Sequence, residues 1–227
     1  MAKQLRKFDT FFDMVYFINL PHRKDRLRNI KKLFEVLSVT RYKQIIPCEA
    51  EKLEIIEGLS RSSQSCKLAH MACLEDAIEN GYERIMIFED DACLNLFDKD
   101  ITVNTDYHLS KCFDFMAQND WGIFFFDNTK RINKRGDVTY WIDKLDEKST
   151  DGGGVVRIGN KQYAHSYAVN GQAIQNLLTL HKSNNRRNDH NLGGFSGFKF
   201  MYDKGIFDQL LNEKTDNNWS PMDIFKK

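Results

Sequence analysis

Residues 83–93 constrain the fold of this chain more than any other segment. Four apolar residues at positions 85–88 run directly into three consecutive carboxylates, Glu89, Asp90 and Asp91. A short apolar run bounded by polar residues is typical of a buried strand, and the absence of alternation favours a parallel sheet. We therefore expect an α/β protein in which these acids stand beyond the carboxyl end of a strand, where open sheets bind ligands.

The three adjacent carboxylates repel one another, and a divalent cation offsets such repulsion most directly. Hard oxygen ligands suit Mg²⁺ or Mn²⁺, and a cation of this kind can bridge to phosphate oxygens. The spacing alone leaves a second interpretation equally open. In that interpretation the strand ends in solvated acids, one of which caps the following turn.

Composition excludes several classes of protein. The chain has 227 residues, of which 41% are hydrophobic and 29% charged, as expected for one globular α/β domain. The net charge of +1 argues against nucleic acid or a membrane surface as partner. No apolar run approaches the roughly 20 residues of a membrane span, and the N-terminal segment does not resemble a signal peptide. Five cysteines without a CxxC pair predict reduced thiols and a cytoplasmic protein.

The first strand is expected at residues 14–20, which are rich in β-formers and end at Pro21. A basic turn follows, and apolar residues at helical spacing then predict a helix over residues 25–37. A helix N-terminus after a strand is a natural anion site, and Arg23 and Arg26 can hold a diphosphate by forked hydrogen bonds. A solvated basic helix start is the alternative.

A second helix is expected at residues 66–80, capped by Ser65 and ending at Gly81. Cys66, His70 and Cys73 lie along one stripe of it. A single helical face offers too few ligands for a closed zinc site. We therefore favour cysteines packed as small hydrophobic residues and a hydrogen-bonded histidine.

The second half of the chain alternates between helical and strand-like segments. We expect helices at residues 107–118 and 172–181, and strands at residues 42–48, 121–126, 138–142, 155–158 and 163–169. The glycine-rich residues 151–154 form either a loop that closes over a ligand or a plain hairpin connection. Residues 183–198 are expected to form an irregular loop, in which Phe195 and Phe198 either stack on a sugar or anchor the loop.

Four segments, taken in order, resemble glycosyltransferase family 25, which includes bacterial lipo-oligosaccharide galactosyltransferases and the galactosyltransferases that modify hydroxylysine in collagen. The segments are Tyr-Phe-Ile-Asn-Leu at residues 16–20 with the following arginines, Cys-Lys-Leu-Ala-His at 66–70, Ile-Phe-Glu-Asp-Asp at 87–91, and Ala-His-Ser-Tyr-Ala-Val-Asn-Gly-Gln-Ala at 164–173. Ser65 and Ala69 stand where the family pattern has glycine and serine.

The resemblance implies an A-type glycosyltransferase fold, which is Rossmann-like with a mixed, mostly parallel sheet flanked by helices. It implies a single glycosyltransferase domain with a nucleotide-sugar-binding half, residues 1–127, and an acceptor-side half, residues 128–227. It also implies inverting transfer of a sugar, galactose or glucose, from a UDP-sugar to a glycan or hydroxylysine-type protein acceptor with the help of Mn²⁺ or Mg²⁺. The oligomeric state is left open.

The resemblance also assigns roles to individual residues. Those placed against the nucleotide or sugar are Asn19, Arg23, Arg26, His70, Glu89 and Asp90. Asp91 would ligate the metal ion, with Glu89 as a further ligand. His165 either completes this metal site, as a late histidine does in some related folds, or is an ordinary core histidine.

The catalytic base is expected to be a single carboxylate, because inversion requires one group to deprotonate the acceptor hydroxyl. Asp223 is the first candidate, since Ser-Pro-Met-Asp at residues 220–223 is similar to a Pro-Val-Asp segment of the family. Asp127, which follows a predicted strand, is the substitute, and Asp203 is a remote third.

Two other functions fit parts of the same pattern. A metal-dependent nucleotidyltransferase or phosphohydrolase would show the same acidic strand end. A non-catalytic family member that acts as a binding module would explain the departures at Ser65 and Ala69.

Overall fold

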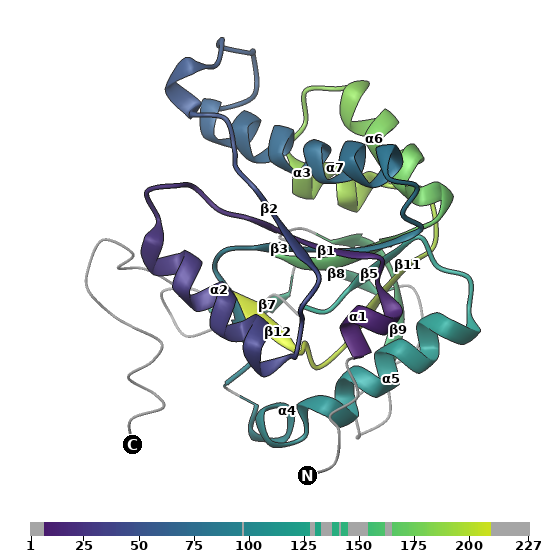
Figure 1. Ribbon diagram of the computed structural model, residues 1–227. Helices are drawn as coiled ribbons and strands as arrows, with labels where there is room; N and C mark the ends of the chain where they lie inside the picture. The colour runs from purple at the N-terminus through teal and green to yellow at the C-terminus, as the bar shows by residue number, and fades with distance from the viewer. Residues whose placement is uncertain are drawn as a thin grey trace.

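The computed structural model describes residues 7–96, 98–127, 130–132, 138–140, 142–144, 154–161 and 165–209, and within them an eight-stranded sheet lies between two layers of helices (Figure 1). The helices are α1 (Lys7–Phe11), α2 (Lys24–Val36), the 3₁₀ turn η1 (Ala50–Lys52), α3 (Arg61–Glu79), α4 (Lys99–Val103), α5 (Thr105–Gln118), α6 (Gln172–Lys182) and α7 (Asn188–Gly194). The strands are β1 (Met14–Ile18), β2 (Tyr42–Ile45), β3 (Arg84–Glu89), β4 (Ala92–Leu94), β5 (Ile123–Phe125), β6 (Lys130–Ile132), β7 (Val138–Tyr140), β8 (Ile142–Lys144), β9 (Val155–Lys161), β10 (Ser166–Asn170), β11 (Lys199–Tyr202) and β12 (Phe207–Gln209).

The main sheet has the strand order β2-β1-β3-β10-β5-β11-β9-β8. Only β10 and β9 run against the direction of the other six strands, so the sheet is mixed and mostly parallel. This confirms the expected Rossmann-like α/β fold. Strand β10 comes from the second half of the chain but lies between β3 and β5, so both halves contribute to one sheet.

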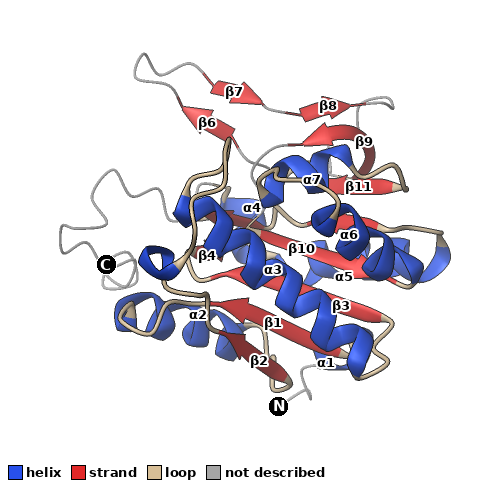
Figure 2. Ribbon diagram, turned by 90° about the horizontal axis from the view of Figure 1, so that it is seen from above, coloured by secondary structure: helices blue, strands red, loops and turns tan. Residues whose placement is uncertain are grey.

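Helices cover both faces of the sheet. Helices α3, α6 and α7 lie on one face, and α1, α2, α4 and α5 lie on the other (Figures 1 and 2). Along β3, Met86 and Phe88 pack into the hydrophobic cluster beneath α2 and α5, while Ile85 and Ile87 pack into the cluster beneath α3 and α6. Successive strand residues point to opposite faces, and here both faces are buried. That is why the strand is apolar without alternation. In the described part of the chain, no helix combines the length and apolar character that crossing a membrane requires.

The start of α3 differs from the sequence prediction. The N-cap is Ser60, whose Oγ accepts a hydrogen bond of 3.2 Å from the backbone N–H of Ser63. Ser65 lies inside the helix, and its hydroxyl donates to the backbone carbonyl of Cys48. The prediction of a cap at Ser65 is wrong because residues 60–65 offer several serines of equal local propensity. The predicted end is confirmed, since Gly81 adopts φ +68°, a conformation that favours glycine.

The segment 183–198 also differs from its prediction as an irregular loop, because it contains α7. The Asn191 side-chain amide donates 2.8 Å to His181 Nδ1 on α6, and the Lys199 ammonium donates to the carbonyl of Gly193. These contacts between elements stabilise a short helix that its composition does not favour. Phe195 is buried in the core and anchors the segment, whereas Phe198 is exposed beneath the Arg157 guanidinium.

We predict that Ser60→Ala lowers the free energy of unfolding by about 1 kcal/mol, because it removes the acceptor at the start of α3. Ser60→Asp keeps a capping oxygen and should retain the wild-type value. Urea denaturation of the three proteins measures both effects. Equal stability of Ser60→Ala and wild type would show that the cap contributes nothing.

Candidate active site

Polar side chains from four strands meet at one edge of the sheet. Asn19 follows β1, Glu89 ends β3 with Asp90 and Asp91 just beyond it, and Asp127 follows β5. His165 precedes β10, which is antiparallel to β3 and therefore begins at the edge where β3 ends. The topology thus brings together residues that are up to 146 positions apart, at the edge where α/β proteins bind ligands.

The basic turn after β1 packs directly on the acids. Arg26, in the first turn of α2, places Nη1 2.8 Å from Asp90 Oδ1 and 3.4 Å from Asp91 Oδ2. The buried Asn19 donates from Nδ2 to Asp90 Oδ2 at 2.8 Å. Arg23 pairs instead with Asp25 at 2.8 Å, and its side chain remains at the cavity wall. The structure therefore brings Asn19, Arg23, Arg26 and Asp90 to one site.

Asp91 is buried, and the structure describes a hydrogen-bond donor for only one of its two carboxylate oxygens. Its Oδ2 accepts from Gln209 Nε2 at 2.8 Å, whereas Oδ1 has no hydrogen-bond partner among the described residues. Nε2 of the buried His165 is likewise without a partner in that part of the chain. Buried polar atoms are nearly always satisfied, which makes these two atoms at the same sheet edge candidate ligands for a further group.

The charge around Glu89 points the same way. Removal from bulk water, together with the carboxylates of Asp91 and Asp90, raises the pKa of Glu89 to about 8, even though 29% of its side chain is exposed toward a cavity. Burial also raises the pKa of Asp90, against the opposing effect of Arg26. A divalent cation held by Asp91 Oδ1, His165 Nε2 and Glu89 would relieve this excess of negative charge. In the arrangement described, the ligand atoms of these three residues do not all lie within 4.8 Å of one another, so their side chains would have to move for all three to bind one ion.

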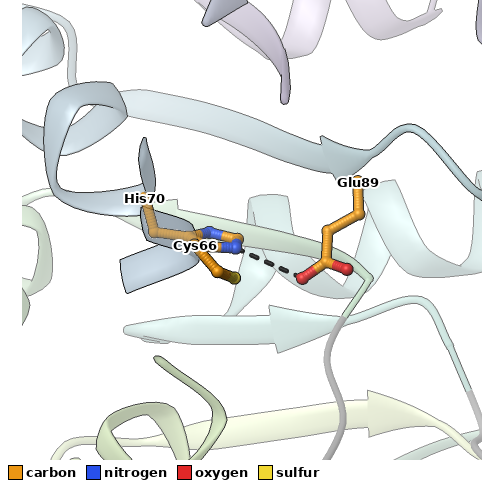
Figure 3. Close-up of side chains that lie close together, drawn as sticks. All are labelled: Cys66, His70 and Glu89. Atoms are coloured by element: carbon orange, nitrogen blue, oxygen red, sulfur yellow. Dashed lines mark hydrogen bonds and ion pairs between the residues drawn. The ribbon is translucent and has the colours of Figure 1, made fainter. Parts of the chain in front are cut away.

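His70 and Cys66 reach this edge from α3. The His70 ring is fully buried, and burial lowers its pKa to about 3, so the imidazole is neutral. Its Nδ1 lies 2.8 Å from the Tyr167 hydroxyl and its Nε2 lies 3.3 Å from Glu89 Oε1. Figure 3 shows Cys66 beside this pair. Cys73 is buried in the core, where the sequence predicted a small hydrophobic residue.

Asp127 has contacts that set it apart from the other acids. Its side chain is fully buried, forms an ion pair with the buried Lys161 and accepts from the backbone N–H groups of His165 (2.9 Å) and Ser166 (3.2 Å). Its Oδ2 also lies 3.6 Å from His165 Nδ1. The carboxylate is thus occupied with holding the start of β10. Of the other base candidates, Asp203 accepts from the backbone of Gly154, and Asp223 lies outside the described residues.

Two connected cavities open at this edge. The larger, of about 600 Å³, is lined by the basic turn, by residues 47–51 and by Glu89 and Asp90. The smaller, of about 250 Å³, is lined by Glu89 and His165 together with α7 and Gln209 of β12. Ser62, Cys66 and Glu89 line both. Glu89 therefore stands at the junction between the cavities.

Sequence reasoning missed several residues of this site. Those contributed by α7 and β12 are Arg187, Asn188, Asp189 and Gln209, and the buried partner of Asp127 is Lys161. None of them belongs to a motif, and each reaches the site only through tertiary packing. Lys161 ends β9 after Gly159 and Asn160, and no local pattern there signals a buried ion pair.

We predict that Asp127→Asn lowers the free energy of unfolding by about 3–5 kcal/mol, because it leaves the Lys161 ammonium buried without a counter-charge. Lys161→Met should cost a similar amount. The double variant Asp127→Asn/Lys161→Met should lose less than the sum of the single variants, since it leaves no charge unpaired. Urea denaturation measures all of them, and a loss below about 1 kcal/mol in Asp127→Asn would contradict a buried ion pair.

A second prediction concerns His181, which holds α7 against α6. Burial lowers its pKa from 6.5 to about 3, so the unfolded chain binds a proton at this residue that the folded chain excludes. Stability should therefore fall as the pH drops from about 6.5 toward 3. His181→Gln should reduce that slope by about one proton, or about 1.4 kcal/mol per pH unit. The neighbouring exposed Lys182→Gln is the control, and identical slopes in His181→Gln and wild type would refute the prediction.

Comparison with solved structures yields matches of low identity. A glycosyltransferase involved in glycosylation of the major capsid of PBCV-1 is 9% identical, with 88% of this chain and 92% of that chain covered and a TM-score of 0.47. A197 from STIV is 11% identical over 88% and 86% of the two chains, with a TM-score of 0.41. Apo UDP-glucose pyrophosphorylase is 8% identical over 83% and 72%, with a TM-score of 0.35. Likenesses this distant carry no argument about activity.

Comparison with curated proteins yields no match. The family model for glycosyltransferase family 25 (LPS biosynthesis protein), in contrast, matches residues 12–192, which include Asn19, Arg26, the acids at the end of β3, Asp127 and His165. The chain therefore belongs to glycosyltransferase family 25, and it is a glycosyltransferase.

Proposed function

We propose that this glycosyltransferase moves a sugar, galactose or glucose, from a UDP-sugar to a hydroxyl group of a glycan or hydroxylysine-type acceptor, with inversion and with the help of Mn²⁺ or Mg²⁺. One observation carries the proposal. The 600 Å³ cavity combines Arg23 and Arg26 with the carboxylates of Glu89 and Asp90 at the carboxyl ends of β1 and β3. Cationic side chains for a diphosphate and acids for a cation thus face the same space.

The donor would occupy this larger cavity. Its lining residues all fall between positions 18 and 90, which supports residues 1–127 as the nucleotide-sugar-binding half. Arg23 and Arg26 lie where they can donate to diphosphate oxygens, and Asn19 holds Asp90 in place. Substitution of Asn19 or Arg26 would therefore leave the acids, as well as the donor, less firmly positioned.

The cation would be held by Asp91 Oδ1 and His165 Nε2, which have no hydrogen-bond partner among the described residues, together with the carboxylate of Glu89. When bound, it stabilises the negative charge that develops on the diphosphate as it leaves. Asp127 acts as a positioning residue in this proposal, because its contacts with Lys161 and the backbone of His165 fix the imidazole at the edge of the sheet.

The acceptor would enter the smaller cavity. Asp189 lines it from the first turn of α7 and is partly exposed there, and in the part of the chain that the structure describes its carboxylate accepts only from the backbone N–H of His190, at 2.9 Å. We assign the role of base to Asp189 among the described residues. It takes the proton of the acceptor hydroxyl as that oxygen attacks the anomeric carbon and the bond from that carbon to the diphosphate breaks.

One prediction tests the proposed metal role of Asp91. Asp91→Asn should reduce both sugar transfer and donor hydrolysis by at least about 100-fold, since it removes a ligand to the cation, while leaving the circular dichroism spectrum unchanged. Asp114→Asn, at an exposed site on α5, is the matched control. Full activity in Asp91→Asn would reject the metal role.

The assay should run UDP-sugars against nucleoside triphosphates and record released UDP and pyrophosphate separately. Release of pyrophosphate alone would favour a nucleotidyltransferase. A thermal shift with UDP and Mn²⁺ is the companion measurement, because a ligand that binds the folded state raises the melting temperature. A binding module without any donor site would show no shift and no turnover.

Another prediction tests the proposed role of Asp189 as base. Asp189→Asn should lower kcat for transfer by about 100-fold to 10,000-fold and leave the affinity for UDP unchanged, because the residue acts on the acceptor. Asp223→Asn, assayed in parallel, decides between the two candidates. Wild-type kcat in Asp189→Asn together with a large loss in Asp223→Asn would overturn the assignment.

A further inference from the structure

We propose that Cys66, His70 and Glu89 form a second cation site, suited to a thiophilic divalent cation of the zinc class. The ligand atoms of the three residues all lie within 4.8 Å of one another. Figure 3 shows the three side chains converging from α3 and from the end of β3 on one point. This set differs from the carboxylate-rich set proposed above, and the two sets share only Glu89.

The geometry is close to what tetrahedral zinc requires. Zinc bonds of about 2.0–2.1 Å to nitrogen and oxygen separate two such ligands by about 3.3 Å. His70 Nε2 and Glu89 Oε1 already lie 3.3 Å apart. A zinc–sulfur bond of about 2.3 Å would bring Sγ to about 3.6 Å from each. Since Sγ lies within 4.8 Å of both atoms, it has to move by at most about 1 Å. Cys66 is partly exposed and lines both cavities, which gives it room for that movement.

The outer contacts of His70 hold the ring ready for a metal ion. The Tyr167 hydroxyl lies 2.8 Å from Nδ1, and the two rings stack with centroids 5.7 Å apart. With the proton on Nδ1 donated to Tyr167, the lone pair of Nε2 points toward Glu89. A hydrogen bond on the far ring nitrogen is the usual companion of a metal-bound histidine.

Charge and ligand type favour zinc over Mg²⁺ or Mn²⁺ at this position. A thiolate and a carboxylate together neutralise a divalent cation, and the thiol proton leaves to solvent on binding. Thiolate and imidazole are softer ligands than the carboxylates around Asp91. Three protein ligands leave a fourth position open toward the cavities. Since Glu89 serves both sets, zinc at this site would inhibit sugar transfer, a consequence that rests on the proposed function.

The test measures protection of a thiol in the wild-type full-length protein, without any sugar donor. Iodoacetamide labels the metal-free protein, and mass spectrometry follows the Cys66 and Cys48 peptides separately, Cys48 being exposed and outside the cluster. At a zinc concentration about ten times the dissociation constant, labelling of Cys66 should slow about tenfold. Labelling of Cys48 should be unchanged, and Mg²⁺ at the same concentration should protect neither.

Variants supply a second measurement. Competition with a chromophoric chelator should show one zinc ion per chain in wild type and in Cys48→Ser, with an affinity at least about tenfold weaker in Cys66→Ser. Equal labelling rates of Cys66 with and without zinc would overturn the site. Because neither measurement involves the donor, that result would leave the proposed sugar transfer standing, and loss of transfer activity in Asp91→Asn would not by itself support the zinc site.

Discussion

Repulsion among the carboxylates at the end of β3 is the interaction on which the site depends. Glu89, Asp90 and Asp91 occupy successive positions where the strand leaves the core, and Asp90 and Asp91 are almost fully buried. Arg26 and Asn19 offset part of that charge from the β1 side. The offset is incomplete, because one oxygen of Asp91 has no hydrogen-bond partner among the described residues and the pKa of Glu89 stays high. An edge with surplus negative charge and an unsatisfied carboxylate oxygen is suited to a cation, and a cation is suited to a diphosphate.

The same edge of the sheet depends on β10, which runs antiparallel to its neighbours. Because β10 is antiparallel, its first residues lie beside the last residues of β3 and β5, and this brings His165 to the acids. The ion pair between Asp127 and Lys161 and the backbone hydrogen bonds to Asp127 hold that start. An ion pair without solvent contact is costly to form and costly to break. Its presence is consistent with a role in positioning the imidazole.

Local patterns were sufficient for much of the fold. The apolar run of β3 reflects burial on both faces, and the helical spacing of α2 reflects one apolar face, so both were readable from the sequence. The basic turn lies beside the acids because parallel β1 and β3 end at the same edge. Asn19, Arg26 and the acids could therefore be expected together.

Features that depend on contacts between distant parts of the folded chain could not be predicted from these local patterns. Helix α7 forms in a segment whose asparagine and glycine content favours a loop, since His181 and Lys199 bind its polar groups from other elements. Asp189 reaches the cavity only as a result, and Gln209 reaches it because β12 pairs with β4. Ser60 rather than Ser65 caps α3 although local propensity does not separate them. Lys161 carries no local sign that its partner is Asp127, which comes 34 residues earlier.

The central claim is that the acids at the end of β3 bind a cation that in turn binds the diphosphate of the donor. Thermodynamic coupling between the two ligands tests it most directly, because each must raise the affinity of the other by the same factor. Calorimetric titration of UDP into the protein with Mn²⁺ present, and again with the cation removed by chelation, gives that factor. The account predicts that UDP binds at least about tenfold more tightly with Mn²⁺. Equal UDP affinity in the two titrations would contradict it.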